Sequence, residues 1–276
     1  MKTNNWIKNK LRKFGAMMRD RMYAFRAGKW DFNERHSIHG VLESIKAVGF
    51  SPKTIIDIGI YMGTEGLYNV WPEARICLIE PLEENMIYLK QIEKKYPSVL
   101  SLNVAASNKD GEIEIWVSPI GAGIITNKAK ERKRKVPTMA IDNIVKDYQL
   151  KPPYILKIDT DGHEREILSG ARNCLNQAEL CIIEIHKFAH LMGNDTITPY
   201  EIFSFMDECG MAFYDFAGRS YGLKPDVRAL RIIDMVFARR DGVVFQETYK
   251  VGEWKGDKTK RRLKQREAAK RRNPNI

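Results

Sequence analysis

The stretch Thr54-Ile-Ile-Asp-Ile-Gly-Ile-Tyr-Met-Gly-Thr-Glu65 is the part of this sequence around which the other motifs are arranged. A short β-branched run that ends in Asp57 and a glycine is typical of a first strand that leads through a turn into a helix. Gly59 and Gly63 allow this turn to be tight and let a ligand come close to the backbone. The stretch therefore predicts the first strand, turn and helix start of an α/β unit.

A second acid stands at the end of the next apolar run. The run Arg75-Ile-Cys-Leu-Ile79 predicts a strand, and Glu80 follows at its carboxyl end. In nucleotide-binding α/β folds, an acid in this position accepts hydrogen bonds from a ribose. Glycines and acids are common at strand ends, so the pair indicates nucleotide binding only in combination with motifs further along the chain.

Strand-like and helix-like segments alternate along most of the chain. Further strands are expected at residues 97–106, 112–117, 154–159, 180–186, 211–216 and 231–238, and helices at 32–50, 82–95, 163–175 and 198–209. This alternation predicts an α/β fold in which helices cover both faces of a mostly parallel sheet. The last two strands predict an antiparallel hairpin at one edge. The charge run at 128–135 is expected to be a solvated loop, or to border a pocket for an anionic substrate.

The net charge of +11 is concentrated at the two ends of the chain. Residues 1–30 hold nine Lys or Arg and one acid, and residues 255–276 hold ten and two, so the part between them is acidic. We therefore divide the chain into a basic amphipathic helix at 1–30, one globular domain at 31–254 and a basic tail at 255–276. The tail is expected to be solvated or to be ordered by a partner.

The amphipathic N-terminal helix has two interpretations. Its apolar stripe can pack against the protein's own core or against a second copy of the chain, which would make a homo-oligomer. Alternatively, the helix lies on an anionic membrane surface, where apolar burial and headgroup attraction both favour binding.

Cysteine spacing and hydropathy indicate a reduced compartment. The four cysteines show no metal-binding spacing, and two of them lie inside apolar runs, as buried thiols do. No apolar run is long enough to span a bilayer, and we expect no secretion signal. The expected location is the cytoplasm, with contact at the inner face of the membrane if the N-terminal helix binds lipid.

Taken together, the motifs resemble the FkbM family of S-adenosylmethionine-dependent methyltransferases. The resemblance covers residues 54–238 in the family's order. It is carried by Ile56-Asp57-Ile58-Gly59 with Gly63, Ile79-Glu80-Pro81, Ala106-Ser-Asn-Lys-Asp-Gly111, Val136-Pro-Thr-Met-Ala-Ile-Asp142, Leu156-Lys-Ile-Asp-Thr-Asp-Gly-His-Glu164, Ile167-Leu-Ser-Gly-Ala171, Ile183-Glu-Ile-His186 and Asp234-Met-Val-Phe237. It implies a Rossmann-like class I methyltransferase fold with a seven-stranded sheet and assigns residues 31–254 to the methyltransferase domain.

The resemblance implies that S-adenosylmethionine binds beyond the carboxyl ends of the strands. Asp57 and Gly59 would face its amino acid part, and the backbone N–H groups of Gly63 and Thr64 would bind its carboxylate. Glu80, followed by Pro81, would bind both ribose hydroxyls. The segment from Asn103 through Ala105 to Ala106 would line the adenine. The family usually has Asn where this chain has Tyr61, so the contact of the turn with the cofactor differs here.

The resemblance also implies that Asp159 and Glu184, at the ends of neighbouring strands, converge beside the cofactor. Lys157, Asp161 and His186 are expected close by. Methyl transfer to a hydroxyl needs alignment of the acceptor and a group to accept its proton, and Asp159 or His186 could be that base. Alternatively, His186 only bonds locally, and Lys157 pairs with Asp161 to hold the loop.

The sequence leaves open whether a metal ion binds. Asp159, Asp161, His163, Glu184 and His186 form an oxygen-rich set that could hold Mg²⁺, although acids also gather at strand ends without a metal.

The predicted function is O-methylation of a hydroxyl on a sugar, a glycan or a related small molecule. The alternative is a protein that binds nucleic acid or another anionic surface through its basic termini, without methyl transfer.

Overall fold

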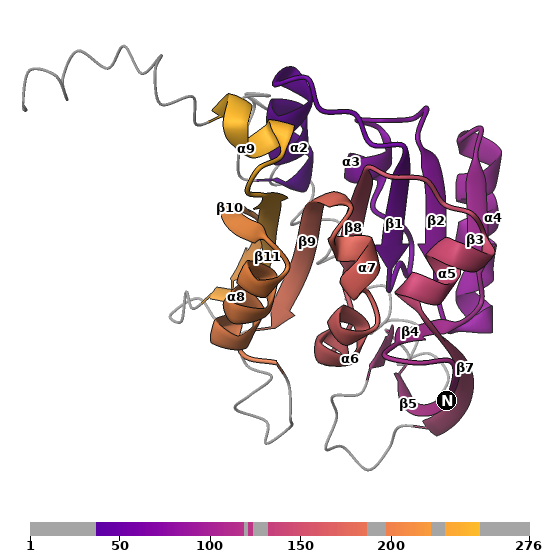
Figure 1. The fold of residues 1–276 in the computed structure, drawn as a ribbon. Coiled ribbons are helices and arrows are strands. Elements are labelled where there is room, and N and C mark those ends of the chain that lie inside the picture. Colours follow the sequence, from indigo (N-terminus) through magenta and orange to yellow (C-terminus); the bar gives the residue numbers. More distant parts are fainter. Residues whose placement is uncertain (1–36, 119–120, 124–131, 187–196, 222–229, 249–276) are drawn as a thin grey trace, which may run out of the picture.

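The computed structural model describes residues 37–118, 121–123, 132–186, 197–221 and 230–248 (Figure 1). The predicted N-terminal helix at 1–30 and the basic tail at 255–276 lie outside these ranges, so they stay predictions. None of the described helices is both long and apolar enough to cross a membrane.

The main sheet has seven strands in the order β10-β11-β9-β8-β1-β2-β3. The strands are β1 (Thr54–Ile58), β2 (Arg75–Ile79), β3 (Val99–Leu102), β8 (Tyr154–Ile158), β9 (Ala178–His186), β10 (Met211–Tyr221) and β11 (Leu230–Arg239). The pairs among β3, β2, β1, β8 and β9 are parallel, while β11 is antiparallel to both of its neighbours. The structure therefore confirms a mostly parallel sheet with an antiparallel hairpin at one edge.

Helices cover both faces of this sheet, as predicted from the alternation of elements. One apolar core packs α5 (Ile141–Asp147), α6 (Glu164–Ser169), α7 (Arg172–Leu175) and α8 (Pro199–Glu208) against the sheet. The other packs α2 (Ile38–Ala47), α3 (Glu65–Tyr68), α4 (Met86–Lys95, preceded by the 3₁₀ turn η1 at Glu83–Asn85) and α9 (Val243–Thr248). Strands β1 and β8 are buried along their whole length because both of their faces are covered.

A second, four-stranded sheet was missed by the sequence analysis. Its strands are β4 (Ala105–Ser107), β5 (Gly111–Ser118), β6 (Gly121–Gly123) and β7 (Arg132–Ala140), in the order β4-β7-β5-β6. Figure 1 shows β4, β5 and β7 next to the carboxyl ends of β1 and β2. The predicted strand at 97–106 is therefore wrong as one unit, because its first half pairs with β2 and its second half with β7.

The prediction of a solvated loop at 128–135 is wrong for the residues from Arg132 onward. The backbone of β7 pairs with the alternating strand β5, which fixes it as a strand despite its charge. Lys133 and Arg134 remain exposed and form ion pairs with Glu114 and Glu84, each at 2.6 Å. Charge along a strand is compatible with pairing when the side chains can reach water.

The predicted helix at 163–175 is split into α6 and α7 at Gly170. A Cβ at Gly170 would lie 2.2 Å from the backbone oxygen of Ser107 in β4. The absence of a side chain at this position lets the small sheet approach the helix layer closely.

We expect Gly170→Ala to destabilise the protein by about 2–3 kcal/mol, because the new methyl group must push β4 away from the helices. The φ angle of Gly170 is −86°, so backbone strain does not contribute. Urea denaturation measures the change, and Ser169→Ala is the matched control, since Ser169 is exposed and should stay within about 0.5 kcal/mol. Equal stability of the two variants would contradict this packing.

Candidate active site

The predicted site residues lie at the carboxyl ends of adjacent parallel strands. Asp57 in β1 is in register with Lys157 in β8, and Glu80 directly follows β2, which pairs with β1 on its other side. Asp57 and Glu80 thus lie at the same edge of the sheet, where ligands of open α/β sheets bind.

Asp57 is completely buried, and its two oxygens differ in their bonding. Oδ2 accepts a short hydrogen bond from the hydroxyl of Tyr68 in α3. Oδ1 is buried without a hydrogen-bond partner among the described residues. Burial raises the pKa of Asp57, while the charge of Lys157 and the bond from Tyr68 act in the opposite direction. An acceptor atom that lacks a donor at this position fits a ligand that brings an N–H group.

The turn after β1 has left-handed backbone angles at Gly59, Tyr61 and Gly63, with φ of +77°, +50° and +94°. A Cβ at Gly59 would lie 1.9 Å from the backbone oxygen of Asp159, so only glycine allows these two strand ends to meet. The N–H of Gly63 donates a hydrogen bond to the backbone oxygen of Ile60 at 2.8 Å.

The helix start after this turn holds Thr64, whose N–H donates to the Tyr68 hydroxyl at 3.1 Å. Both amides that were predicted to bind a ligand carboxylate, those of Gly63 and Thr64, therefore have partners within the chain. Their role toward a cofactor stays a prediction.

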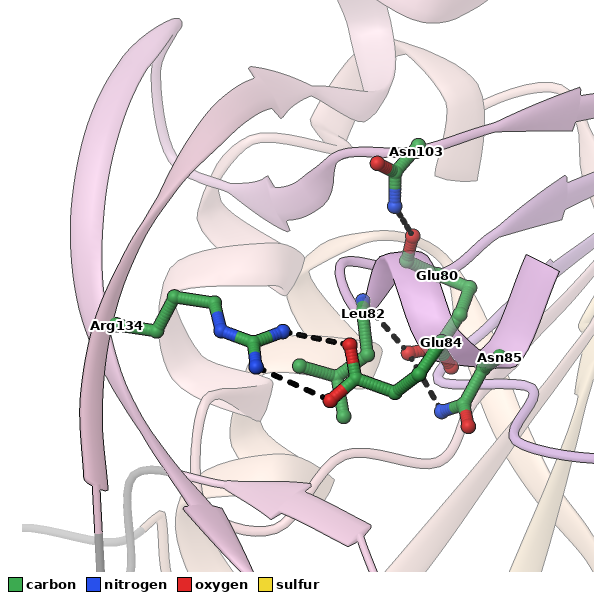
Figure 2. A network of polar contacts seen from close by, with 6 residues as sticks. All are labelled: Glu80, Leu82, Glu84, Asn85, Asn103 and Arg134. Carbon is green, nitrogen blue, oxygen red and sulfur yellow. Dashed lines mark hydrogen bonds and ion pairs between the residues drawn. The ribbon is translucent and has the colours of Figure 1, made fainter.

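Glu80 is the most densely bonded carboxylate of the site (Figure 2). Its Oε1 accepts from the Leu82 N–H at 2.9 Å and the Asn85 side-chain amide at 3.1 Å, and its Oε2 accepts from the Tyr61 N–H at 3.0 Å. A carboxylate has about four acceptor positions, so one remains on Oε2. This position is available to a ligand hydroxyl, and the predicted contact of Glu80 with both ribose hydroxyls stays a prediction.

The loop that carries Glu80 is held by the small sheet. Leu82 packs into an apolar cluster with Ala105, Ile115 and Val136, all from β4, β5 and β7. Next to it, Glu84 forms two hydrogen bonds with the guanidinium of Arg134 in β7, which Figure 2 shows beside the Glu80 network.

The remaining residues predicted for the adenosine part lie around Glu80. Asn103 is exposed and donates from its side-chain amide to the backbone oxygen of Glu80 at 3.0 Å. Pro81 is partly buried between Glu80 and Leu82, while Ala105 is buried in the apolar cluster of the small sheet. Asn103 and Pro81 are thus accessible next to Glu80, and their contact with adenine stays a prediction.

The second half of the site is organised around Lys157. This side chain is 3% exposed, and its ammonium donates to Oδ2 of Asp159 at 2.5 Å. The ion pair of Lys157 is therefore with Asp159 and not with Asp161, the alternative partner that the sequence analysis considered. Asp159 itself is 35% exposed, so it is the member of this pair that a bound molecule can touch.

Three described carboxylates lie close enough to act on the ammonium of Lys157. Burial lowers the pKa of Lys157, but the neighbouring charges of Asp159, Asp57 and Asp234 outweigh it and hold the pKa above its usual range. Burial raises the pKa of Asp159 to about 7, with Lys157 opposing and Glu184 and Asp234 reinforcing the rise. A carboxyl that titrates near neutral pH can take up a proton during catalysis.

Of the other predicted residues, His163 and Asp161 are described, whereas the side chain of His186 is not. His163 is hydrogen-bonded to Ser107 at 3.0 Å and faces Glu166, so it belongs to the contact between β4 and α6. Asp161 is exposed in the turn before α6. The backbone of His186 pairs with β11, but its side chain is outside the described part. Within the described ranges, no group of three or more His, Cys, Asp or Glu side chains could hold a metal ion.

Three residues of the site were missed by the sequence analysis: Tyr68, Asn85 and Asp234. Tyr68 and Asn85 bond to Asp57 and Glu80, and nothing in a sequence marks such cross-element partners. Asp234 had a signal, since Ile-Ile-Asp at 232–234 repeats the pattern of a single acid in an apolar strand that singled out Asp57.

The strand order, the single reversed strand β11 in the described sheet and the acids at the carboxyl ends of its strands define a Rossmann-like class I methyltransferase fold. Residues 57–213 match the methyltransferase FkbM domain. The chain belongs to the FkbM methyltransferase family.

The chain is also similar to individual proteins and solved structures. A hexuronic acid methyltransferase, AglP, of Haloferax volcanii is 28% identical over 131 residues, which cover 47% of this chain and 54% of the relative. The match therefore spans about half the length of that protein. The crystal structure of methyltransferase FkbM from Methylobacillus flagellatus is 18% identical with a TM-score of 0.42, covering 66% of this chain and 43% of that chain. The N-methyltransferase NodS of Bradyrhizobium japonicum in complex with S-adenosylhomocysteine is 9% identical with a TM-score of 0.40, covering 77% and 92%.

Removing the Tyr68 hydroxyl should leave the buried carboxylate of Asp57 without its described donor. We expect Tyr68→Phe to lower the free energy of unfolding by about 2–3 kcal/mol at pH 8, the cost of an unsatisfied buried charged group. Tyr96→Phe is the control, because its hydroxyl bonds to the neutral Asn69 side chain at 2.6 Å and should cost about 1 kcal/mol. A smaller loss for Tyr68→Phe than for Tyr96→Phe, measured by urea denaturation, would contradict this assignment.

Asp234 should make stability depend on pH. Burial raises its pKa to about 6, whereas an aspartate in the unfolded chain titrates near about 4. The folded protein therefore binds this proton more tightly, and its stability should fall as the pH rises from about 4 to about 6. We expect Asp234→Asn to remove this part of the dependence and to raise stability at pH 8 by about 1–3 kcal/mol. Urea denaturation across this range, with the exposed Asp241→Asn as control, checks it; parallel curves for wild type and Asp234→Asn would count against it.

Proposed function

We propose that this protein transfers a methyl group from S-adenosylmethionine to a hydroxyl group of a saccharide. The observation that carries the proposal is the placement of Asp57 and Glu80, each with an acceptor position left over, at one edge of the sheet. Family membership supports a methyl donor, and the relative AglP is named for methylation of a hexuronic acid. The saccharide acceptor comes from this analogy and from the carboxylates near Asp159.

The donor half of the site lies on β1 and β2. Asp57 Oδ1 would accept from the amino group of the donor, and Glu80 Oε2 would accept from one ribose hydroxyl. When bound, S-adenosylmethionine supplies an electrophilic methyl group on a sulfonium. Because three N–H groups of the chain already orient Glu80, the carboxylate does not have to reorganise when the ribose arrives.

The acceptor half lies on β8 and its neighbours on the side away from β2. Asp159 is partly exposed and has a pKa raised to about 7 by burial, which suits it to accept the proton of the attacking hydroxyl at neutral pH. Lys157 positions this carboxylate through the bond to its Oδ2 and does not itself face the solvent. The role of His186 as an alternative base and the binding of a Mg²⁺ ion stay predictions.

The predictions for the termini also stay open. Binding of nucleic acid or of an anionic membrane, and assembly into a homo-oligomer, depend on residues 1–30 and 255–276, which lie outside the described ranges.

Titration of the full-length protein with S-adenosylhomocysteine tests the donor site. We expect heat of binding for the wild type and at least about tenfold weaker binding for Glu80→Gln. The reason is that the new amide NH₂ would face at least one N–H donor, whichever of the two carboxylate oxygens it replaces. Glu83→Gln, at an exposed position in the same loop, should bind like the wild type. If the wild type gives no heat, the donor assignment fails. Transfer of labelled methyl from S-adenosylmethionine to a panel of methyl glycosides then tests the acceptor.

A further inference from the structure

The turn between β8 and α6 carries Asp159, the proposed proton acceptor, and a carboxylate of the following helix holds this turn. Glu164 is the first residue of α6 and is 6% exposed. Its Oε1 accepts hydrogen bonds from the Thr160 hydroxyl at 3.1 Å and from the Gly162 N–H at 3.0 Å. A single oxygen thus binds two of the residues that follow Asp159. Because hydrogen bonds to a carboxylate are stronger than those between neutral groups, this pair of bonds limits the conformations of the turn.

The opposite side of the same turn packs against the turn after β1. The Asp159 N–H donates to the backbone oxygen of Ile58 at 3.0 Å. A Cβ at Gly59 would lie 1.9 Å from the backbone oxygen of Asp159 and 3.1 Å from the side-chain methyl of Thr160. The Thr160 methyl therefore lies next to the donor half of the site, while its hydroxyl is bonded to Glu164. Both branches of this side chain are engaged, and a β-branched residue has few other rotamers.

The start of α6, which carries Glu164, is anchored independently of the turn. Nε2 of His163 is hydrogen-bonded to the hydroxyl of Ser107 in β4 at 3.0 Å, and its Nδ1 lies 3.4 Å from a carboxylate oxygen of Glu166. Ile167, one helical turn further along, is completely buried in the apolar core. Glu164 is thus attached to a fixed element, and the turn is the part that would move if its bonds were lost.

The position of Asp159 decides how tightly it binds a proton. Burial is the largest of the causes that raise its pKa to about 7. Lys157 of β8 lowers the pKa, while Glu184 of β9 and Asp234 of β11 raise it further. All of these effects depend on where the turn holds the carboxylate, since burial and charge interactions both weaken as a group moves into water. The turn therefore controls whether Asp159 can accept a proton near neutral pH.

We propose that Glu164 is a positioning residue, which holds the turn after β8 so that Asp159 stays bonded to Lys157 beside the donor half of the site. The proposal rests on the proposed function, because it concerns the group that would accept the proton of the acceptor hydroxyl. Glu164 acts through the turn and does not itself take up this proton. A carboxylate that only stabilised the start of α6 would add to stability without changing the proton affinity of Asp159.

The proton affinity of Asp159 can be measured without donor or acceptor. Full-length protein with isotope-labelled aspartate carboxyl groups is titrated with acid and base by NMR, and Asp159→Asn identifies the signal. We expect Glu164→Ala to weaken the proton affinity at least about tenfold, because burial is the largest cause of the raised pKa and a released turn exposes the carboxylate. Thr160→Val removes one of the two bonds, keeps the shape and should weaken it about fivefold.

Three control variants separate position from charge and from local stability. Glu164→Gln loses the charge but keeps an oxygen for both bonds, Thr160→Ser keeps the hydroxyl, and Glu166→Ala truncates a side chain that faces His163 instead of the turn. In all three, the proton affinity of Asp159 should stay within about twofold of the wild type. If Glu164→Ala and Thr160→Val leave it unchanged, or if Glu164→Gln weakens it as much as Glu164→Ala does, the positioning role is wrong. Should thermal unfolding show that Glu164→Ala does not fold, Thr160→Val, at a partly exposed position, decides the question.

The two proposals fail in different ways. If the wild type does not bind S-adenosylhomocysteine, the methyl-donor assignment fails, while the titration of Asp159 still judges the role of Glu164. An unchanged proton affinity in Glu164→Ala and Thr160→Val defeats the positioning role, whatever happens to the donor. A wild-type Asp159 that titrates in the ordinary range of an aspartate would overturn both the proton acceptor and its positioning residue.

Discussion

The ion pair between the buried Lys157 and the partly exposed Asp159 is the interaction on which the rest of the site depends. An ammonium that is 3% exposed in a central strand is costly unless carboxylates surround it. Asp57 lies in register with it on β1, and Asp234 acts on it from β11. The same charge therefore stabilises acids on three strands and fixes where they stand. Without it, the closely spaced carboxylates would repel one another or remain protonated.

The donor half of the site depends on a different constraint, the packing of the small sheet against the loop after β2. Leu82 is buried with Val136 and Ile115 of that sheet, and its backbone N–H holds Glu80. Apolar burial thus fixes Leu82, and the N–H of Leu82 in turn orients the carboxylate of Glu80. The pair Glu84 and Arg134 ties the same loop to β7 at the surface, where an exposed ion pair adds little stability but limits the geometry.

The two halves differ in how the chain encodes them. Residues for the donor come from β1, β2 and the loops that follow, all of which fall within the match to the FkbM domain. Asp234 lies on β11, after that match, and its carboxylate packs closely against Gly218 of β10.

The sequence by itself determined the α/β class, the parallel sheet with its edge hairpin, and the acids Asp57, Glu80 and Asp159 at strand ends. These follow from local patterns, because apolar periodicity and strand-end acids can be recognised within a few residues. Only the tertiary structure decided that the segment around Asn103 divides between two sheets and that Asp234 joins the acids of the site. Both outcomes depend on partners that are distant in the chain. A strand pairs with the neighbour that satisfies its backbone hydrogen bonds, and a carboxylate interacts with the charge that the fold places next to it.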